Sequence, residues 1–278
     1  MKPFNKDNIE YFAHRIRRHI VNTIASNGEG HVGGALSGTD IIAVLYSTLM
    51  NIIPNDLLHS DKFILSAGHK CLALYGALVE SNLIEEDLLK TYNQLGTPLP
   101  GHPDATKLCG VDFSTGSLGH GLSLGCGYAL AAKLNMDGYK TFVLMGDGEQ
   151  GEGSNWEAAA FAAHNKLDNI CAIIDENNMQ INGRTCEICK PTPYDERYKA
   201  FGWSVKTVDG HDVKALYDAL STVPFEIGKP SLIVATTIKG KGVSFLEDKI
   251  EYHHWNPNHE QGAMAMAEIN ECGKRWKK

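Results

Sequence analysis

The stretch Thr141-Phe-Val-Leu-Met-Gly146-Asp147-Gly148-Glu149-Gln150-Gly151-Glu152-Gly153 joins a mainly apolar run to a loop of glycines and acids. An apolar run without alternation, followed by glycines and then a helical pattern, is typical of a buried strand that leads into a helix. The sequence therefore predicts a strand at 141–145 and a helix at 154–164.

The same pairing of an apolar run with a helical pattern recurs on both sides of this stretch. Further strands are predicted at 62–66, 169–174, 204–208 and 232–236. Further helices are predicted at 71–81, 85–92, 120–134 and 213–221. Strands that are apolar throughout and alternate with helices form parallel sheets that are covered on both faces. We therefore expect an α/β fold of three layers, with a mostly parallel sheet between two layers of helices.

Two more helices are expected before the first strand. Apolar residues recur at three- and four-residue spacing in the first of them, at Ile9, Phe12, Ile16 and Ile20. Its basic run, 14–19, is interpreted as a solvated helix face. The second helix is expected to start at a cap-like Thr39 and to run through 41–50.

The length, net charge and apolar runs of the chain exclude several classes of protein. No linker or repeat divides the 278 residues, so 1–278 is expected to be a single domain with an N-terminal helix and a C-terminal tail. A net charge of −7 gives no field for nucleic acid or an anionic membrane. The longest nearly apolar run, 41–53, is too short to span a bilayer, and the first residues lack the apolar region of a signal peptide.

The cysteines indicate a reducing compartment. Seven cysteines at irregular spacing argue against a disulfide framework and favour a cytoplasmic location. Cys186 and Cys189 form a lone C-x-x-C pair, and no second pair completes a zinc site. We interpret them as two loop cysteines.

Three segments directly follow predicted strands, at 66–70, 146–153 and 175–183. The carboxyl ends of parallel strands meet at one edge of a sheet, and ligands bind in the crevice beyond them. These segments are therefore expected to form one ligand-binding rim.

Helix 120–134 carries Gly121, Gly125 and Ala129 on one line, at positions i, i+4 and i+8. Such a stripe of small residues lets another backbone approach closely. The sequence leaves open whether the sheet or another subunit lies against it.

The glycines at 146, 148 and 151 match the G-x-G-x-x-G pattern of dinucleotide-binding proteins. Asp175 stands at the end of the next predicted strand, where such proteins place a ribose-binding acid. An NAD-dependent dehydrogenase is therefore one hypothesis.

Three carboxylates in the same turn count against that hypothesis. Asp147, Glu149 and Glu152 would repel a diphosphate by about 4 kcal/mol per charge pair at roughly 4 Å and an effective dielectric of about 20. Either no phosphate binds, or a divalent cation lies between Asp147 and the phosphate. Asn177 lies 30 residues beyond Asp147, one strand–helix–strand unit, so their loops are expected to meet at the rim. Both side chains offer the oxygen ligands that magnesium prefers.

The residues at this point resemble a family. GDGEQGEG at 146–153 followed by DENNMQING at 175–183 is similar to the thiamine-diphosphate motif, which opens with GDG and ends in NN. Further segments narrow the resemblance to the transketolases, namely GHVG at 30–33, LSAGH at 65–69, PGHP at 100–103, TGSLGHG at 115–121, and KGKG at 239–242 with His253. They occur in the family's order and cover about residues 10 to 260.

The resemblance implies a metal and cofactor site. Asp147, the side chain of Asn177 and the carbonyl of Met179 would hold Mg²⁺, or another divalent cation, on the diphosphate of thiamine diphosphate. The other implied cofactor-binding residues are His69, Gly116, Ser117, Leu118, Gly148, Asn177, Lys239 and His253. His69, Lys239 and His253 would lie at the diphosphate end, and 116–118 would line the ring side.

The implied catalytic residues are His31, His102, His253 and Glu152. His31 and His102 would face the reacting centre, and histidine suits proton transfer near neutral pH. Glu152 resembles the family's buried acid near the junction of two active sites. His254 adjoins His253, so the register there could slip by one residue. The remaining histidines receive no role, namely His14, His19, His59, His164, His211 and His259.

The implied function is that of a transketolase, which moves a two-carbon ketol unit from a ketose phosphate to an aldose phosphate in pentose phosphate and carbohydrate metabolism. The resemblance covers only the family's diphosphate-binding domain, without the pyrimidine-binding and C-terminal domains. It therefore implies the N-terminal subunit of a split transketolase, active only with a C-terminal partner, with two copies of each in the hetero-oligomer. A homodimer is an alternative assembly, and a deoxyxylulose-phosphate-synthase-like enzyme is an alternative activity. Val32 and Ser117 depart from the family, which commonly has proline at both positions.

Overall fold

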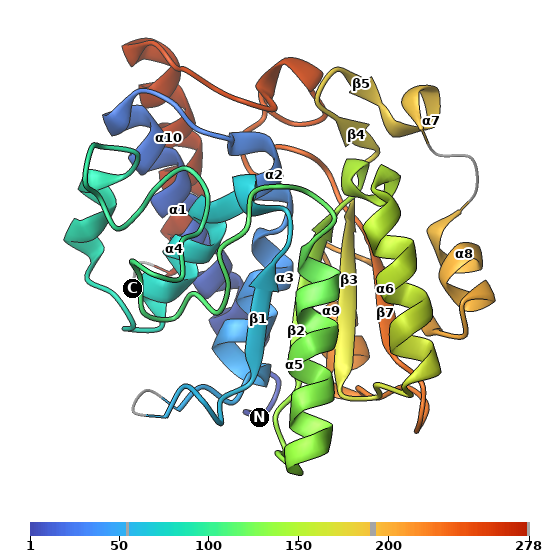
Figure 1. Ribbon diagram of the computed structural model, residues 1–278. Coiled ribbons are helices and arrows are strands. Elements are labelled where there is room, and N and C mark those ends of the chain that lie inside the picture. The colour runs from blue at the N-terminus through green and yellow to red at the C-terminus, as the bar shows by residue number, and fades with distance from the viewer. Residues whose placement is uncertain (54–55, 190–192, 277–278) are drawn as a thin grey trace.

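Five parallel strands form the central sheet, in the order β1-β2-β3-β7-β6 (Figure 1). In this computed structural model, which describes residues 1–53, 56–189 and 193–276, the strands are β1 (Lys62–Leu65), β2 (Thr141–Gly146), β3 (Ile170–Glu176), β6 (Ser204–Asp209) and β7 (Ser231–Thr236). Each predicted strand is confirmed, and no end differs by more than two residues.

Helices cover both faces of the sheet. In Figure 1, α5 (Gly121–Asn135) and α6 (Gly153–His164) lie in front of the sheet, and α3 (Thr39–Val44) and α9 (Val213–Ser221) lie behind it. The core behind the sheet also includes α1 (Lys6–Asn27) and α4 (Cys71–Glu80).

Successive side chains of each strand enter different cores, as the two-residue repeat of a strand requires. In β3, Ile170, Ala172 and Ile174 pack with α5 and α6, whereas Cys171 and Ile173 pack with the helices behind. All five side chains are fully buried, which explains why the strand is apolar throughout. The expected three-layer α/β fold is confirmed.

The predicted helix from Thr39 through 41–50 is divided in the structure. A short helix, α2 (Val32–Ser37), precedes it, and a π-helical turn (Leu45–Leu49) follows α3. Thr39 lies inside α3 and is not its cap, because its hydroxyl donates to the carbonyl of Ala35 at 2.8 Å. The predicted helix 85–92 is a 3₁₀ helix (Glu86–Thr91).

Besides α2, the sequence did not predict the helices α7 (Thr185–Ile188), α8 (Tyr194–Ala200) and α10 (His259–Gly273). α10 lies within the expected C-terminal tail and packs against α1. A capping box starts α10: the side chain of Asn258 accepts from the Gln261 amide at 2.9 Å, and the side chain of Gln261 accepts from the Asn258 amide at 3.2 Å. This N-x-x-Q pattern is the sequence signal that could have located the helix.

The stripe of small residues on α5 faces the sheet. A Cβ at Gly125 would lie 2.5 Å from Cγ2 of Val143, and one at Gly121 would collide with Cβ of Ser66. Ala129 is fully buried. The stripe therefore lets α5 pack closely on the sheet, and the alternative of a contact with another subunit is wrong.

The basic residues of α1 and the location of Cys186 differ from what the sequence predicted. Arg15, Arg17 and His19 on α1 are held by carboxylates, so the interpretation of 14–19 as a solvated face is wrong for them. All seven cysteines are free; Cys186 lies in the short helix α7 (Thr185–Ile188), not in a loop. Within the described ranges, no helix is long and apolar enough to cross a bilayer.

Candidate active site

The carboxyl ends of β1, β2, β3 and β7 open onto one cavity of about 470 Å³. The structure brings these predicted site residues together in its lining: His31, His69, His102, Gly116, Leu118, Asp147, Gly148, Glu152, Asn177, Met179, Lys239 and His253. Ser117 is exposed and is not part of the lining. The predicted rim is thus a real cavity, built from segments far apart in the sequence.

The carboxylate of Asp147 and the side-chain amide of Asn177 lie on one side of the cavity. Asp147 is only 2% exposed; its Oδ1 accepts from the Tyr194 hydroxyl and its Oδ2 accepts from the Asn178 amide, both at 2.5 Å. Oδ1 of Asn177 accepts from the Met179 amide at 3.1 Å. Carboxylate and amide oxygens have two lone pairs each, so these atoms can accept a hydrogen bond and still bind a cation.

The positions of Asp147 and Asn177 follow from the sheet. Gly146 of β2 pairs with Asp175 of β3, so the two loops leave the sheet side by side. The first loop then approaches a hairpin of β4 (Met179–Gln180) and β5 (Gly183–Arg184), where a Cβ at Gly148 would lie 2.5 Å from Cβ of Gln180. Only glycine allows this approach.

A cluster of imidazoles lies on another side of the cavity. The ring centroid of His31 is 5.4 Å from that of His69, 5.9 Å from that of His102 and 5.4 Å from that of His253. Burial, followed by neighbouring cationic groups, lowers the pKa of His31 to about 4 and that of His253 to about 3. Burial also lowers the pKa of His69 and that of His102. At neutral pH each ring is therefore uncharged, with one nitrogen that donates and one that accepts.

The structure distinguishes the two adjacent histidines in position. His253 lines the cavity, whereas His254 is exposed and is not among the lining residues. The ring of His254 stands edge-on to His31, with centroids 4.8 Å apart. Of the two, only His253 is a lining residue, and both rings contact that of His31.

Lys239 brings a buried positive charge to the cavity. The residue is 2% exposed, and its Nζ lies 3.1 Å from Nδ1 of His253. Burial, followed by the charge of Lys70, lowers the pKa of Lys239 to about 8. In the described part of the chain, no carboxylate lies within ion-pair distance of this ammonium. A buried cation without a close anionic partner is suited to an anionic ligand.

Sequence reasoning missed Lys70, which lines the cavity and is almost fully buried. Its Nζ lies 2.5 Å from Oδ2 of Asp175, which also accepts from the Ser37 hydroxyl at 2.5 Å, while Oδ1 accepts from the Thr237 hydroxyl. Although burial opposes its charge, Lys70 and these hydrogen bonds hold the pKa of Asp175 below its usual range. Asp175 is fully buried and cannot reach a ribose. The residue that the dehydrogenase hypothesis needs to bind the ribose is therefore not available.

Glu149, two residues after Asp147, is buried. Its carboxylate accepts from the amides of Gly119 and Gly146, both at 2.8 Å, and from the Ser66 hydroxyl, and burial raises its pKa. Glu149 thereby joins the loop after β2 to the loop before α5. Glu152 was expected to be buried, but on this chain it is exposed at the start of α6, where it lines the cavity.

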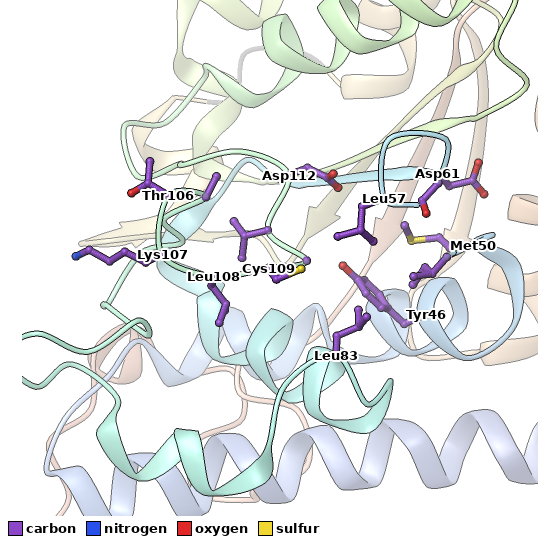
Figure 2. A pocket seen from close by; sticks show the side chains of 15 residues that line it. Tyr46, Met50, Leu57, Asp61, Leu83, Thr106, Lys107, Leu108, Cys109 and Asp112 are labelled. Carbon is purple, nitrogen blue, oxygen red and sulfur yellow. The ribbon is translucent and has the colours of Figure 1, made fainter. Parts of the chain in front are cut away.

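A second cavity, of about 430 Å³, lies beside the amino end of β1 (Figure 2). Its lining includes Tyr46, Leu57 and Leu108, and none of the predicted site residues. Its two carboxylates bind backbone amides: Asp61 accepts from Asn51 at 2.8 Å and from Lys140 at 2.7 Å, and Asp112 accepts from Phe63 at 2.8 Å. These carboxylates hold the fold together at the start of the strand.

Comparison with known proteins identifies the family of this chain. A family model described as "Transketolase, thiamine diphosphate binding domain" matches residues 9–269. The chain belongs to the transketolase family. The part of a transketolase that it contains is the thiamine diphosphate binding domain, and the resemblance drawn from the sequence is confirmed.

Its relatives include short and long transketolases. The chain is 41% identical to one of the subunits of the apulose-4-phosphate transketolase of Actinobacillus succinogenes, over 98% of this chain and 100% of that protein. It is 40% identical to the "6-deoxy-6-sulfo-D-fructose transketolase subunit SqwG" of a Clostridium species, over 95% of this chain and 97% of that protein. The crystal structure of transketolase from Campylobacter jejuni matches with a TM-score of 0.89 and 30% identity, over 96% of this chain and 43% of that one. The chain thus spans less than half the length of that transketolase.

The residues of the cavity fit a diphosphate with a divalent cation. Among residues 1–53, 56–189 and 193–276, no group of three or more His, Cys, Asp or Glu residues could hold a metal ion by itself. A cation beside Asp147 and Asn177 would therefore need oxygens from a ligand, and Mg²⁺ is usually bound by few protein groups together with phosphate oxygens. The ammonium of Lys239 supplies a positive charge in the same cavity.

Proposed function

We propose that this chain is the N-terminal subunit of a thiamine diphosphate- and magnesium-dependent transketolase. It transfers a two-carbon ketol unit from a ketose phosphate to an aldose phosphate, and it acts together with a C-terminal partner subunit. The observation that carries the proposal is one cavity at the strand ends that combines Asp147 and Asn177 with the buried ammonium of Lys239 and with the imidazole cluster. The printed names of the relatives, which are transketolase subunits, support the partner.

Three groups of this chain hold the metal in the proposal: the carboxylate of Asp147, the side-chain oxygen of Asn177 and the backbone carbonyl of Met179. Another divalent cation could replace Mg²⁺, because other divalent cations also bind oxygen ligands. The ammonium of Lys239 partly neutralises the diphosphate, and the donor nitrogens of His69 and His253 bind its oxygens.

Thiamine diphosphate, when bound, supplies the electron sink for breaking and forming the carbon–carbon bond. Residues 116–118 line its ring side, and Gly148 allows its diphosphate a close approach. His31 and His102 are neutral at pH 7, so a ring nitrogen of each can take a proton from a substrate hydroxyl and return it. While Lys239 is protonated it can only donate, so Nδ1 of His253 accepts and Nε2 carries the proton that the ring can offer.

The proposed working state contains two copies of each subunit. Glu152, which is exposed and lines the cavity, is the acid that would lie at the junction between active sites. A homodimer is the alternative assembly. A cytoplasmic location is supported by the seven free cysteines.

Sugar phosphates are the proposed substrates. The two relatives are named for apulose-4-phosphate and for 6-deoxy-6-sulfo-D-fructose, so similar chains serve different sugars. A deoxyxylulose-phosphate-synthase-like activity would use the same cofactor, but no observation specifically favours it.

The test is reconstitution. The chain is purified alone and with a C-terminal transketolase subunit from the same genome, and two-carbon transfer between sugar phosphates is assayed with thiamine diphosphate and Mg²⁺. Activity is expected only in the mixture, and it should vanish when Asp147→Ala replaces the wild type. Strong activity of the chain alone would overturn the split-subunit proposal, because it would need a cofactor-activating acid within these 278 residues.

A further inference from the structure

An ion-paired group of three side chains lies behind the wall of the cavity. Nη1 and Nη2 of Arg17 lie 2.9 and 2.6 Å from Oδ1 and Oδ2 of Asp40, and Nδ1 of His211 lies 2.8 Å from Oδ2 of Asp40. The side chains of Arg17, Asp40 and His211 are 13%, 8% and 14% exposed. Burial opposes the charge of Asp40, but Arg17 and His211 outweigh it and lower its pKa to about 2.

The group is joined to both ends of a four-residue segment, 238–241. Nε2 of His211 accepts from the Ile238 amide at 2.8 Å, and Nε of Arg17 donates to the Lys241 carbonyl at 3.1 Å. Because Nε2 of His211 accepts a hydrogen bond, the proton of the neutral ring must be on Nδ1, where it is donated to Asp40. The histidine thus has a fixed tautomer and links the carboxylate to the segment.

Lys239 lies between these two anchors. The Lys239 carbonyl accepts from the Asp248 amide at 2.9 Å, and the Gly240 amide donates to the carbonyl of Gly33 at 3.0 Å. Gly240 has φ +82°, and a Cβ there would collide with the carbonyl oxygen of Leu246. The backbone therefore has one tight path, and that path determines where the ammonium of Lys239 enters the cavity.

We propose that Arg17, Asp40 and His211 form a positioning group that fixes 238–241 and thereby holds Lys239 at the diphosphate end of the cavity. None of the three lines the cavity, so they act through the loop rather than on the ligand. The contacts of Arg17 and His211 fix the segment, and the role of Lys239 at a diphosphate rests on the proposed function.

The same helix carries a natural control. Nε of Arg15 lies 3.0 Å from Oε1 of Glu80, and Nε2 of His19 lies 2.7 Å from the same oxygen. This second arginine–carboxylate–histidine group is also partly buried, but its further contact is with Glu86 on the 3₁₀ helix and with no loop of the cavity. Loss of either histidine removes a hydrogen bond to a carboxylate, but only His211 also bonds the segment 238–241.

The experiment compares His211→Asn, His211→Gln and the control His19→Asn in the full chain. Asparagine keeps a donor near Asp40 but does not reach Ile238, whereas glutamine places an acceptor farther out, toward the Ile238 amide. Amide hydrogen exchange at Ile238, Gly240 and Lys241 is measured by mass spectrometry. We expect exchange about 10-fold faster in His211→Asn, as for a segment that opens locally, and near the wild-type rate in the other two variants.

A second measurement tests the consequence for the ligand. Calorimetry with Mg²⁺ and the partner should show thiamine diphosphate affinity reduced about 10-fold in His211→Asn, the scale seen when a group that orients a ligand-binding residue is lost. At saturating cofactor, kcat should be unchanged, which separates positioning from catalysis. His19→Asn should leave the affinity at the wild-type value.

The outcomes separate the two proposals. If the wild-type complex binds no thiamine diphosphate, the proposed function fails, and the exchange measurement still decides whether the group fixes the segment. Unchanged exchange at 238–241 in His211→Asn overturns the inference, and so does an equal effect of His19→Asn. If His211→Asn does not fold, Arg17→Lys takes its place, because lysine cannot bind Asp40 through two nitrogens and also reach Lys241.

Discussion

The cavity at the carboxyl ends of the strands and the cavity beside the amino end of β1 differ little in size and greatly in what their charged groups do. Their volumes are about 470 and 430 Å³. In the cavity at the carboxyl ends of the strands, Lys239 is buried without a carboxylate within ion-pair distance, in the described part of the chain. In the cavity of Figure 2, Asp61 and Asp112 bind backbone amides.

The comparison shows that cavity volume does not locate an active site in this fold. At the carboxyl ends of parallel strands the chain leaves the sheet in loops, which can present side chains to a ligand. At the amino end of β1, Asp61 and Asp112 fix the course of the backbone into the strand. The first cavity should therefore respond to substitution in ligand binding, and the second in stability.

The largest effect is expected at the proposed metal ligands. Asp147→Ala or Asn177→Ala should weaken magnesium-dependent binding of thiamine diphosphate by more than about 100-fold, since loss of even an indirect metal contact costs about 10- to 100-fold. Calorimetry in the presence of the partner measures this, with circular dichroism as the check on folding. Unchanged affinity in either variant would contradict the metal assignment.

The next effect divides the histidines of the same cavity. His31→Ala and His102→Ala should retain cofactor affinity and lose about 10²- to 10⁴-fold in kcat, the usual contribution of proton transfer. His69→Ala and His253→Ala should weaken cofactor binding instead. The rings of His31 and His253 have centroids only 5.4 Å apart, so the division is a strict test. It fails if both pairs change affinity and kcat in the same pattern.

A smaller effect is expected from pH, through Lys239. The pKa of Lys239 is about 8 in the free chain, so the ammonium loses its proton as the pH rises through that value. An anionic ligand favours the protonated form, so thiamine diphosphate affinity should be level below about pH 7.5 and fall above about pH 8, by up to about 10-fold per pH unit. Lys239→Met should bind more weakly and show no such fall. Titrations on both sides of the pKa make the comparison, and an identical profile for both proteins would refute the role of Lys239.

The smallest effect on cofactor binding is expected from the second cavity. Asp61→Ala removes the acceptor for the amides of Asn51 and Lys140 and should lower the free energy of unfolding by about 1–3 kcal/mol, measured by urea denaturation. Thiamine diphosphate affinity should stay within about 2-fold of the wild type, a change below about 0.5 kcal/mol. A large loss of affinity here would break the contrast between the two cavities.

The sheet and the cavity could be predicted because their signals are local. The apolar run and glycine loop of 141–153 predict a strand, a turn and a helix in consecutive order, and the structure has them. The spacing of Asp147 and Asn177 is that of one strand–helix–strand unit, and β2 and β3 are indeed neighbours. Residues that follow the strands therefore meet at one edge whatever their distance along the chain.

The supporting ion pairs could not be predicted, because their partners are far apart in sequence. Lys70 and Asp175 are separated by 105 positions, and Asp40 and His211 by 171. Arg17 stands in a run of basic residues that resembles an exposed helix face, but in the fold it bonds Asp40 of α3 and the carbonyl of Lys241. Local periodicity carries no information about such partners.

The central claim is that a metal-bound diphosphate occupies the cavity at the strand ends. A crystal structure of the complex with the partner subunit, thiamine diphosphate and Mn²⁺ tests it most directly, because Mn²⁺ gives an anomalous signal and takes the same oxygen ligands as Mg²⁺. The account predicts one strong anomalous peak within coordination distance of Asp147 and Asn177, with diphosphate density between it and Lys239. An anomalous peak elsewhere, or cofactor density outside this cavity, would contradict it.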